Sequence, residues 1–333
     1  MAKLFKLTIL LFFIASFVAW LQYKQFLTTP ITLPEQTMIY TLPSGSNLQT
    51  VSRDLVKQGI SPLPASYLHV YGRITGKAKL IKAGQYTLKA GTTLPDLLEQ
   101  FIDGKVVQYP LTIIEGMTSA ELISMLAAEP KLKKAIEDTS LTTIMTALGK
   151  PNRYGEGEFA PETYYFTSGT SDLAILKRAH NLLQKNLESA WKNRAKDLPY
   201  KTPYEALIMA SIIEKETGIA EERPEIAGVF VRRLNKGMRL QTDPTVIYGL
   251  GDKFDGNLRR KDLTTDTPYN TYTRFGLPPT PIALASKDAI IAALNPKKGT
   301  SLYFVATGHE GRHYFSDTLA EHNKAVRKYQ LKR

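Results

Sequence analysis

The chain has 333 residues, with 43 lysines and arginines against 31 aspartates and glutamates, so its formal net charge is +12. Its hydrophobic (43%) and charged (22%) fractions exclude a disordered or collagen-like chain, and its length favours two folded units over one. The sequence lacks cysteine, which excludes disulfides, thiol nucleophiles and cysteine metal sites. The positive charge favours an anionic partner: nucleic acid, a membrane surface or a polymer that bears carboxylates.

An apolar stretch near the N-terminus, Leu7–Leu21, follows two basic residues, Lys3 and Lys6. It is short for a spanning helix and long for the core of a signal peptide. No small-x-small cleavage pair lies near its end, and Trp20 and Tyr23 lie where aromatic rings anchor at a bilayer interface. We interpret it as an uncleaved transmembrane anchor, with a cleaved signal peptide as the alternative. The lysines predict a cytoplasmic N-terminus and export of the remaining roughly 300 residues, which excludes nucleic acid as the partner.

Residues 28–37 contain two prolines and no helical period, which predicts a linker. Hydrophobic periodicity then predicts, in order, a strand, two helices, a strand, a helix and a strand, over Met38–Leu42, Asn47–Lys57, Ala65–Ile74, Leu80–Leu88, Leu94–Ile102 and Val106–Ile114. A glycine followed by a capping residue recurs at Gly45, Gly91 and Gly116. This pattern indicates a turn that leads into a capped helix, although many unrelated helices begin in the same way.

The middle of the chain is predicted to be mostly helical, over Ala120–Leu126, Leu141–Leu148 and Asp172–Trp191. The segment Arg153–Gly169 interrupts these helices as a loop with three glutamates and five aromatic residues. Acidic groups beside aromatic rings suit a carbohydrate groove, because sugar faces stack on rings while hydroxyls bind carboxylates. Many surface loops have the same composition, so both interpretations stay open.

The segment Pro203–Thr217 is predicted to form a helix that is apolar on nearly all sides and therefore buried. Its last turn contains Glu214 and Glu216. Burial and the negative end of the helix dipole both raise the pKa of a carboxyl group in such a turn, as a general acid requires. Alternatively, one or both glutamates reach solvent or pair with neighbouring cations, and periodicity does not separate the two residues.

A further helix is predicted over Pro224–Asn235, followed by proline-rich and aromatic loops suited to lining a rigid groove, at Leu240–Gly249, Pro268–Tyr272 and Gly276–Ile282. The remaining predicted elements are a helix, two strands and a helix capped by Ser316, over Lys287–Leu294, Leu302–Ala306, His313–Phe315 and Asp317–Tyr329.

Several enzyme signatures are missing from the sequence: it has no HExxH motif, no Gly-x-Ser-x-Gly elbow and no Walker A loop. These absences argue against a zinc peptidase, an α/β-hydrolase and an NTPase. His309 and His313 are close in the sequence and fit either a metal pair or, more simply, an ordinary hairpin.

The sequence resembles the endolytic murein transglycosylases, the MltG or YceG-like family. The segments that carry the resemblance are Ala210–Thr217 (ASIIEKET), Glu222-Arg223, Arg232–Leu234, Gly237–Gly249 (GMRLQTDPTVIYG), Pro268–Tyr272 (PYNTY), Gly276–Pro279, Phe315-Ser316 and Leu319–Asn323. The resemblance covers nearly the whole chain after the apolar stretch.

This resemblance implies an α+β fold with an N-terminal transmembrane helix, a small LysM-like α/β subdomain and a larger mixed α+β catalytic domain. The expected boundaries are 1–27 for the cytoplasmic tip and anchor, 28–37 for the linker, 38–110 for the LysM-like subdomain and 111–333 for the YceG-like catalytic domain.

The resemblance also implies a catalytic residue, the first glutamate of the Glu-Lys-Glu triplet, Glu214. It would protonate the glycosidic oxygen and then accept the proton of the C6 hydroxyl of N-acetylmuramic acid, so no water, metal or other cofactor is expected. Candidate substrate-binding residues in the matching segments are Gln241, Asp243, Tyr248, Asn270 and Tyr272. Each of these five could equally be a buried hydrogen-bonding residue that shapes the loops.

The function implied is endolytic cleavage of the bond between N-acetylmuramic acid and N-acetylglucosamine within glycan strands, which leaves 1,6-anhydro ends and terminates strand elongation. The alternatives are a glycan-binding scaffold without catalysis and a hydrolytic muramidase. The expected partners are peptidoglycan strands, the inner membrane and peptidoglycan synthases, and not nucleic acid. The expected location is the cell inner membrane, crossed once, with the catalytic domain in the periplasm.

Overall fold

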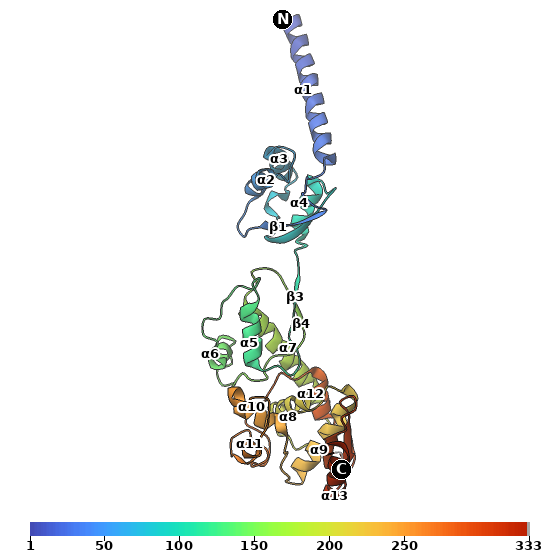
Figure 1. The fold of residues 1–333 in the computed structure, drawn as a ribbon. Helices are drawn as coiled ribbons and strands as arrows, with labels where there is room; N and C mark the ends of the chain where they lie inside the picture. The colour runs from blue at the N-terminus through green and yellow to red at the C-terminus, as the bar shows by residue number, and fades with distance from the viewer. Residues whose placement is uncertain (332–333) are drawn as a thin grey trace. The chain divides into compact units, whose positions relative to one another are not determined.

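The computed structural model describes residues 1–331 and combines helices with short antiparallel strand pairs, which confirms a mixed α+β fold (Figure 1). The chain divides into two compact units. Unit 1 comprises Met1–Tyr109 and Tyr165–Ser168, and unit 2 comprises Pro110–Tyr164 and Gly169–Arg333.

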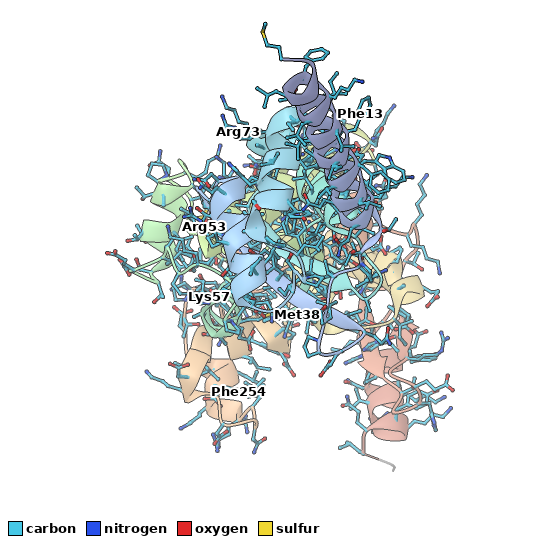
Figure 2. The ribbon with its side chains drawn as sticks, turned by 90° about the horizontal axis from the view of Figure 1, so that it is seen from above. Phe13, Met38, Arg53, Lys57, Arg73 and Phe254 are labelled. Carbon is cyan, nitrogen blue, oxygen red and sulfur yellow. The ribbon has the colours of Figure 1, made fainter. Side chains whose placement is uncertain are left out.

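The first helix, α1 (Ala2–Thr28), extends beyond the predicted apolar stretch at both ends. Its residues Leu4–Thr28 are long and apolar enough to cross a membrane, and Phe13 projects from it without a covering element (Figure 2). The last turn of α1 differs from the rest, because Phe26 is only 2% exposed and its ring lies 5.0 Å from that of Tyr71. The C-terminal end of α1 is therefore part of the core of unit 1.

Unit 1 is built on one antiparallel pair, β1 (Thr37–Leu42) with β2 (Gly84–Lys89). The helices α2 (Leu48–Lys57) and α3 (Ala65–Ile74) lie between the two strands in the sequence, and α4 (Leu94–Asp103) follows them. Aromatic side chains fill the core of unit 1, where the rings of Tyr40, Tyr86 and Phe101 contact one another. Basic side chains extend from the outside of α2 and α3, at Arg53, Lys57 and Arg73 (Figure 2).

Residues 28–37, predicted to be a linker, are tied to unit 1 by backbone hydrogen bonds. The amide of Ile31 donates to the carbonyl of Thr92 (2.8 Å), and the amide of Thr32 donates to the carbonyl of Ile60 (2.9 Å). Ile31 is also buried, at 5% exposed. This segment therefore forms part of the folded unit and has little freedom of its own.

The recurring glycine and cap pattern is confirmed at all three sites. The side chains of Asn47, Thr93 and Thr118 accept hydrogen bonds from backbone amides in the first turns of α2, α4 and α5 (Ser119–Ala128). The three preceding glycines have positive φ angles, which a side chain would disfavour: Gly45 80°, Gly91 87° and Gly116 77°.

Unit 2 is organised around α8 (Pro203–Glu216), which begins at the Thr202 cap with proline at its first position. Every residue from Ala206 to Ile213 is buried, as expected for a helix that is apolar on all sides. Four helices pack against α8: α7 (Asp172–Lys192), α9 (Arg223–Asn235), α10 (Asp243–Leu250) and α12 (Lys287–Leu294). This packing fixes the last turn of α8, where the two glutamates lie.

The rest of unit 2 consists of short elements. They are α6 (Leu141–Ala147), the 3-10 turns η2 (Ala220–Glu222) and η3 (Gly251–Lys253), α11 (Arg260–Thr264), the hairpin β5 (Tyr303–Ala306) with β6 (His313–Ser316), and α13 (Leu319–Tyr329). The cap of α13 is Thr318 and not Ser316 as predicted, because the chain stays in strand β6 up to Ser316.

The segments predicted as loops contain regular structure that the prediction missed. Part of Arg153–Gly169 forms β4 (Thr163–Phe166), which pairs with β3 (Tyr109–Thr112), a strand shorter than predicted. Most of Leu240–Gly249 forms α10, with Asp243 and a proline in its first turn. β4 and α10 have only four and eight residues, so hydrophobic periodicity gives little signal for them.

Candidate functional site

A pocket of about 560 Å³ lies in unit 2 between the ends of α8 and α9, the segment 240–243, the β5–β6 hairpin and α13. Polar and aromatic side chains dominate its wall: Glu216, Arg233, Gln241, Asp243, Tyr272, Tyr303, His313 and His322. The elements that supply them are far apart in the sequence and meet because α8 and α9 pack against each other and β5 packs on α9.

Glu216 is the acidic residue of α8 that lines this pocket. Its carboxyl group accepts a hydrogen bond from the hydroxyl of Thr242. Its pKa is raised to about 7, mainly by burial and also by the nearby Asp243 carboxylate, while the Thr242 bond and the charges of His313 and Arg233 act against the rise. A group with this pKa exchanges protons readily at neutral pH, so the rise expected from the sequence is found at Glu216.

This raised pKa predicts a pH-dependent unfolding free energy. Because the native state holds the Glu216 proton more tightly than an exposed glutamate (pKa 4.5), its stabilising contribution is complete below pH 4.5 and is lost as the pH rises through about 7. The loss amounts to about 3–4 kcal/mol, because the two pKa values differ by about 2.5 and each pKa unit corresponds to about 1.4 kcal/mol.

Denaturant unfolding of the wild type and of Glu216→Gln between about pH 4 and 8 measures this contribution. The wild type should lose about 3 kcal/mol more than the variant over this range. A difference between the two proteins that does not change with pH would contradict the raised pKa.

Glu214, one half-turn earlier in α8, lies in a different environment. Its side chain is 4% exposed, and Arg223 donates to one carboxylate oxygen at 3.1 Å. The backbone amide of Ser286 donates to the other oxygen at 2.8 Å, and the hydroxyl of Ser286 also donates to it. Since Ser286 caps α12, Glu214 connects α8 to the start of α12 and to Arg223. It does not line the pocket.

Three of the five candidate substrate-binding residues lie together at the pocket: Gln241, Asp243 and Tyr272. The hydroxyl of Tyr272 donates to Asp243 at 2.5 Å. Burial and the Asp243 carboxylate raise the pKa of Tyr272, so its hydroxyl stays protonated as a donor. Gln241 has a positive φ of 49°, a conformation that costs energy in a residue other than glycine and that turns the chain at the pocket wall.

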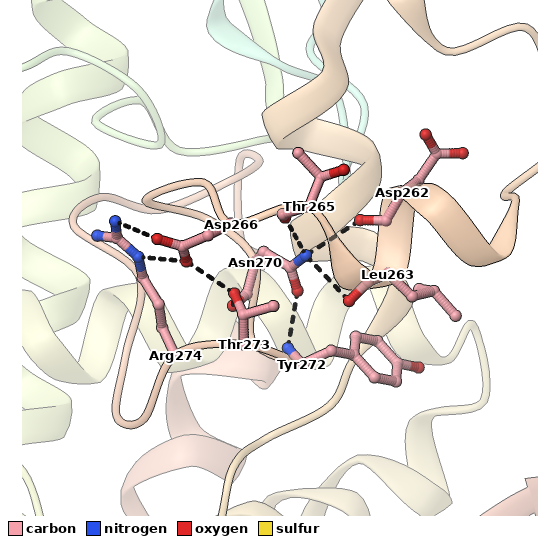
Figure 3. A network of polar contacts seen from close by, with 8 residues as sticks. All are labelled: Asp262, Leu263, Thr265, Asp266, Asn270, Tyr272, Thr273 and Arg274. Atoms are coloured by element: carbon pink, nitrogen blue, oxygen red, sulfur yellow. Dashed lines mark hydrogen bonds and ion pairs between the residues drawn. The ribbon is translucent and has the colours of Figure 1, made fainter.

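The other two candidates lie in hydrogen-bond networks away from the pocket. Tyr248 donates to the buried Glu156 at 3.2 Å, and its ring lies 4.9 Å from that of Tyr269. Asn270 is fully buried, and its amide nitrogen donates to three backbone carbonyls while its oxygen accepts from the amide of Tyr272 at 2.9 Å (Figure 3). Both residues therefore shape the loops, and Asn270 does so directly beside Tyr272.

Two of the three glutamates of the loop Arg153–Gly169 are also held inside unit 2, whereas Glu162 is exposed. Glu156 is 2% exposed and accepts from the amide of Ser119 at 2.9 Å. Glu158 is fully buried and is paired with Arg153 at 3.0 Å. For these two glutamates the structure favours a role in holding the loop over one in a carbohydrate groove.

Sequence reasoning did not propose Arg233, His313 or His322 as site residues. Arg233 is fixed by hydrogen bonds to the carbonyls of Leu302 (2.6 Å) and Leu240 (2.7 Å), so its guanidinium group is held at the pocket wall. His313 belongs to a hairpin, as the simpler interpretation predicted, yet its ring lines the pocket. No spacing signal links these residues to Glu216, because only tertiary packing brings them together.

The sequence matches the model of a family described as the YceG-like family over residues 40–328. It is 32% identical over 332 residues to a protein of Bacillus subtilis (strain 168) named endolytic murein transglycosylase, with 92% of this chain and 89% of the relative covered. It is 31% identical over 320 residues to a protein of the same name from Streptococcus pneumoniae serotype 2 (strain D39 / NCTC 7466), of which it spans 57%.

A solved structure is similar along most of its length. It is a crystal structure of a yceG-like protein from Listeria monocytogenes, with 32% sequence identity and a TM-score of 0.53. The match covers 87% of this chain and 99% of the other. The sequence comparison and the structural comparison therefore both find YceG-like proteins.

Proposed function

The chain belongs to the YceG-like family, and from this membership we propose that it is an endolytic murein transglycosylase that cleaves peptidoglycan glycan strands. The bond cut is the one between N-acetylmuramic acid and N-acetylglucosamine inside a strand, and the product carries a 1,6-anhydro end. The observation that carries this proposal is the polar pocket around Glu216, whose pKa of about 7 suits general acid catalysis at neutral pH.

Glu216 is the proposed proton donor. It combines a position on the pocket wall with a raised pKa, so it can give a proton to the glycosidic oxygen as the bond breaks. Glu214, implied by the resemblance, uses both carboxylate oxygens within the α8–α12–Arg223 network. We therefore assign Glu214 a positioning role and keep it as the alternative acid in the experiments below.

The proposed substrate contacts come from the same wall. Gln241 and Asp243 offer hydrogen-bonding groups, and the ring of Tyr272 offers a face on which a sugar can stack. Arg233 supplies a fixed positive charge that attracts a carboxylate of a stem peptide. Of the two remaining candidates, Asn270 supports this wall through its bond to the amide of Tyr272, whereas Tyr248 is bonded to Glu156 away from the pocket.

A hydrolytic muramidase is the second candidate, because Asp243 is a second carboxylate on the same pocket wall. Hydrolytic glycosidases use two carboxylates, one as an acid and one as a base or nucleophile. Asp243 is hydrogen-bonded to Tyr272, which favours a binding role for it and makes the lyase the preferred proposal.

Mass spectrometry of glycan strands digested by the full-length chain in detergent tests this proposal. Internal cuts that end in 1,6-anhydro-N-acetylmuramic acid are the expected result. Reducing ends would support the muramidase, and intact strands with a folded protein would support a scaffold without catalysis.

We also propose that α1 anchors the protein in the cell inner membrane and that both folded units lie in the periplasm. The support is the length and apolar character of Leu4–Thr28. Unit 1, with two helices between its paired strands, is the proposed LysM-like subdomain, and its exposed basic residues suit an anionic polymer. Peptidoglycan synthases are the proposed protein partners, because cleavage of new strands would terminate their elongation.

A further inference from the structure

A carboxylate and an imidazole form a pair at the edge of the pocket. Glu222 belongs to η2 and His313 to β6, and both side chains are 10% exposed. One oxygen of Glu222 accepts from the backbone amide of His313 at 3.0 Å, and the other lies 2.8 Å from the ring atom Nδ1. Since a carboxylate only accepts hydrogen bonds, the proton lies on Nδ1 in this pair.

The second ring nitrogen of His313 is left open. Nε2 forms no hydrogen bond with residues 1–331. It is also not one of the buried, unpartnered side-chain atoms of that part of the chain, so it is accessible. Because His313 lines the pocket, a ligand there can reach Nε2. In the neutral ring the proton lies on Nδ1 and Nε2 presents its lone pair to the pocket, as a general base requires.

The ring is also held in place by aromatic neighbours. The ring of Phe304 lies edge-on at 5.4 Å between centroids, and that of Phe315 lies at 6.5 Å. Neighbouring strand pairing and the Glu222 bonds fix the backbone and the ring together. Such an oriented imidazole has little rotational freedom to lose when a substrate binds.

We propose that His313, oriented by Glu222, is a catalytic base that accepts the proton of the C6 hydroxyl while Glu216 acts as the acid. This inference rests on the proposed function. Glu216 gives its proton to the glycosidic oxygen as the C1–O4 bond breaks, the C6 oxygen forms the new bond to C1, and the hydroxyl proton passes to Nε2. The imidazolium then releases a proton to solvent while the Glu216 carboxylate takes one up, so protons and electron pairs balance.

The division of labour has a physical basis. A single carboxyl group would have to reach the leaving oxygen and the C6 hydroxyl in turn, whereas two groups on different elements can serve both positions at once. Glu216 and His313 lie on the wall of the same pocket, so one bound sugar can contact both. The other titratable groups on this pocket wall are Arg233, Asp243, Tyr272, Tyr303 and His322.

Two substitutions of His313 test the assignment in the full-length chain in detergent. Asparagine keeps a donor at the position of Nδ1 and removes Nε2, while glutamine places a polar group near Nε2 that is not a base. Both variants should lower kcat for formation of anhydro ends by on the order of 10²–10⁴ with little change in KM, and both should abolish the acidic limb of the pH profile. Exposed His309 in the same hairpin provides the control, His309→Asn, with unchanged rates.

Glu222→Gln tests the orienting role. Glutamine carries no negative charge to hold the Nδ1 proton, so kcat should fall with little change in KM while some activity remains. If His313→Asn instead keeps the wild-type rate and pH profile, His313 only supports Glu222 and the inference is wrong. A wild-type protein that makes no anhydro ends would overturn the proposed function itself.

A measurement on the wild type covers the case in which the variants do not fold. Diethyl pyrocarbonate should modify His313, shown by peptide mass spectrometry, with loss of activity and protection by added glycan strands. Buried His180, at 3% exposed, is the internal control that should stay unmodified. Modification of His313 without loss of activity would overturn the proposal.

Discussion

Glu216→Gln should lower the rate of formation of 1,6-anhydro ends by on the order of 10²–10⁴, which is the usual contribution of a general acid. Glutamine keeps the shape and can still accept from the hydroxyl of Thr242, but it has no proton to give to the glycosidic oxygen. The loss should appear in kcat, and the thermal unfolding temperature should not fall. Mass spectrometry of digested strands with the full-length protein measures the rate.

The matched control is Glu214→Gln, in the same turn of α8. Its side-chain oxygen can still accept from Ser286, so the network is weakened but not removed. We expect anhydro ends to form at a rate much closer to that of the wild type. The opposite pattern, with Glu216→Gln active and Glu214→Gln inactive in a folded protein, would identify Glu214 as the acid.

Of the single substitutions described, removal of the Glu214 side chain should lower the free energy of unfolding the most. Glu214→Ala leaves the guanidinium group of Arg223, 13% exposed, without its ion-pair partner and also removes the acceptor of Ser286. Breaking a buried ion pair in this way costs about 3–5 kcal/mol. Denaturant unfolding of the two proteins should show this loss at neutral pH.

A double substitution separates the unpaired charge from the lost packing. Glu214→Ala combined with Arg223→Met removes both charges, so it should recover a substantial part of the stability lost in the single variant. If the double variant is no more stable than Glu214→Ala, the ion pair with Arg223 is not what stabilises this end of α8.

Long elements were predictable because their hydrophobic patterns agree with their caps. Helices α3 and α12 occupy the predicted residues, and α2 begins directly after the expected Asn47 cap. Two short elements, β4 and α11, were missed, because four and five residues are less than the window that periodicity needs, although the equally short strands β5 and β6 were predicted. Residues 28–37 were predicted to be a linker because they contain two prolines and no helical period. Their backbone hydrogen bonds join residues far away in the sequence, which a local pattern does not show.

The sequence pattern located the two candidate acids in the last turn of one helix. The pattern placed both glutamates at the end of a buried helix, but 3.6-residue periodicity says nothing about what lies beyond that end. The difference arises from Ser286 beside Glu214 and from the segment 240–243 beside Glu216. The pairing of Glu222 with His313 spans 91 residues of sequence, so only the folded hairpin reveals it.

The burial of Phe26 has a mechanical consequence. The last turn of α1 belongs to the core of unit 1, and the residues after it are hydrogen-bonded to the same unit. The helix therefore joins unit 1 without a flexible connecting segment. With α1 in a bilayer, unit 1 would be held directly at the membrane surface. A force applied to unit 1 would then act directly on α1, because no flexible segment would extend first.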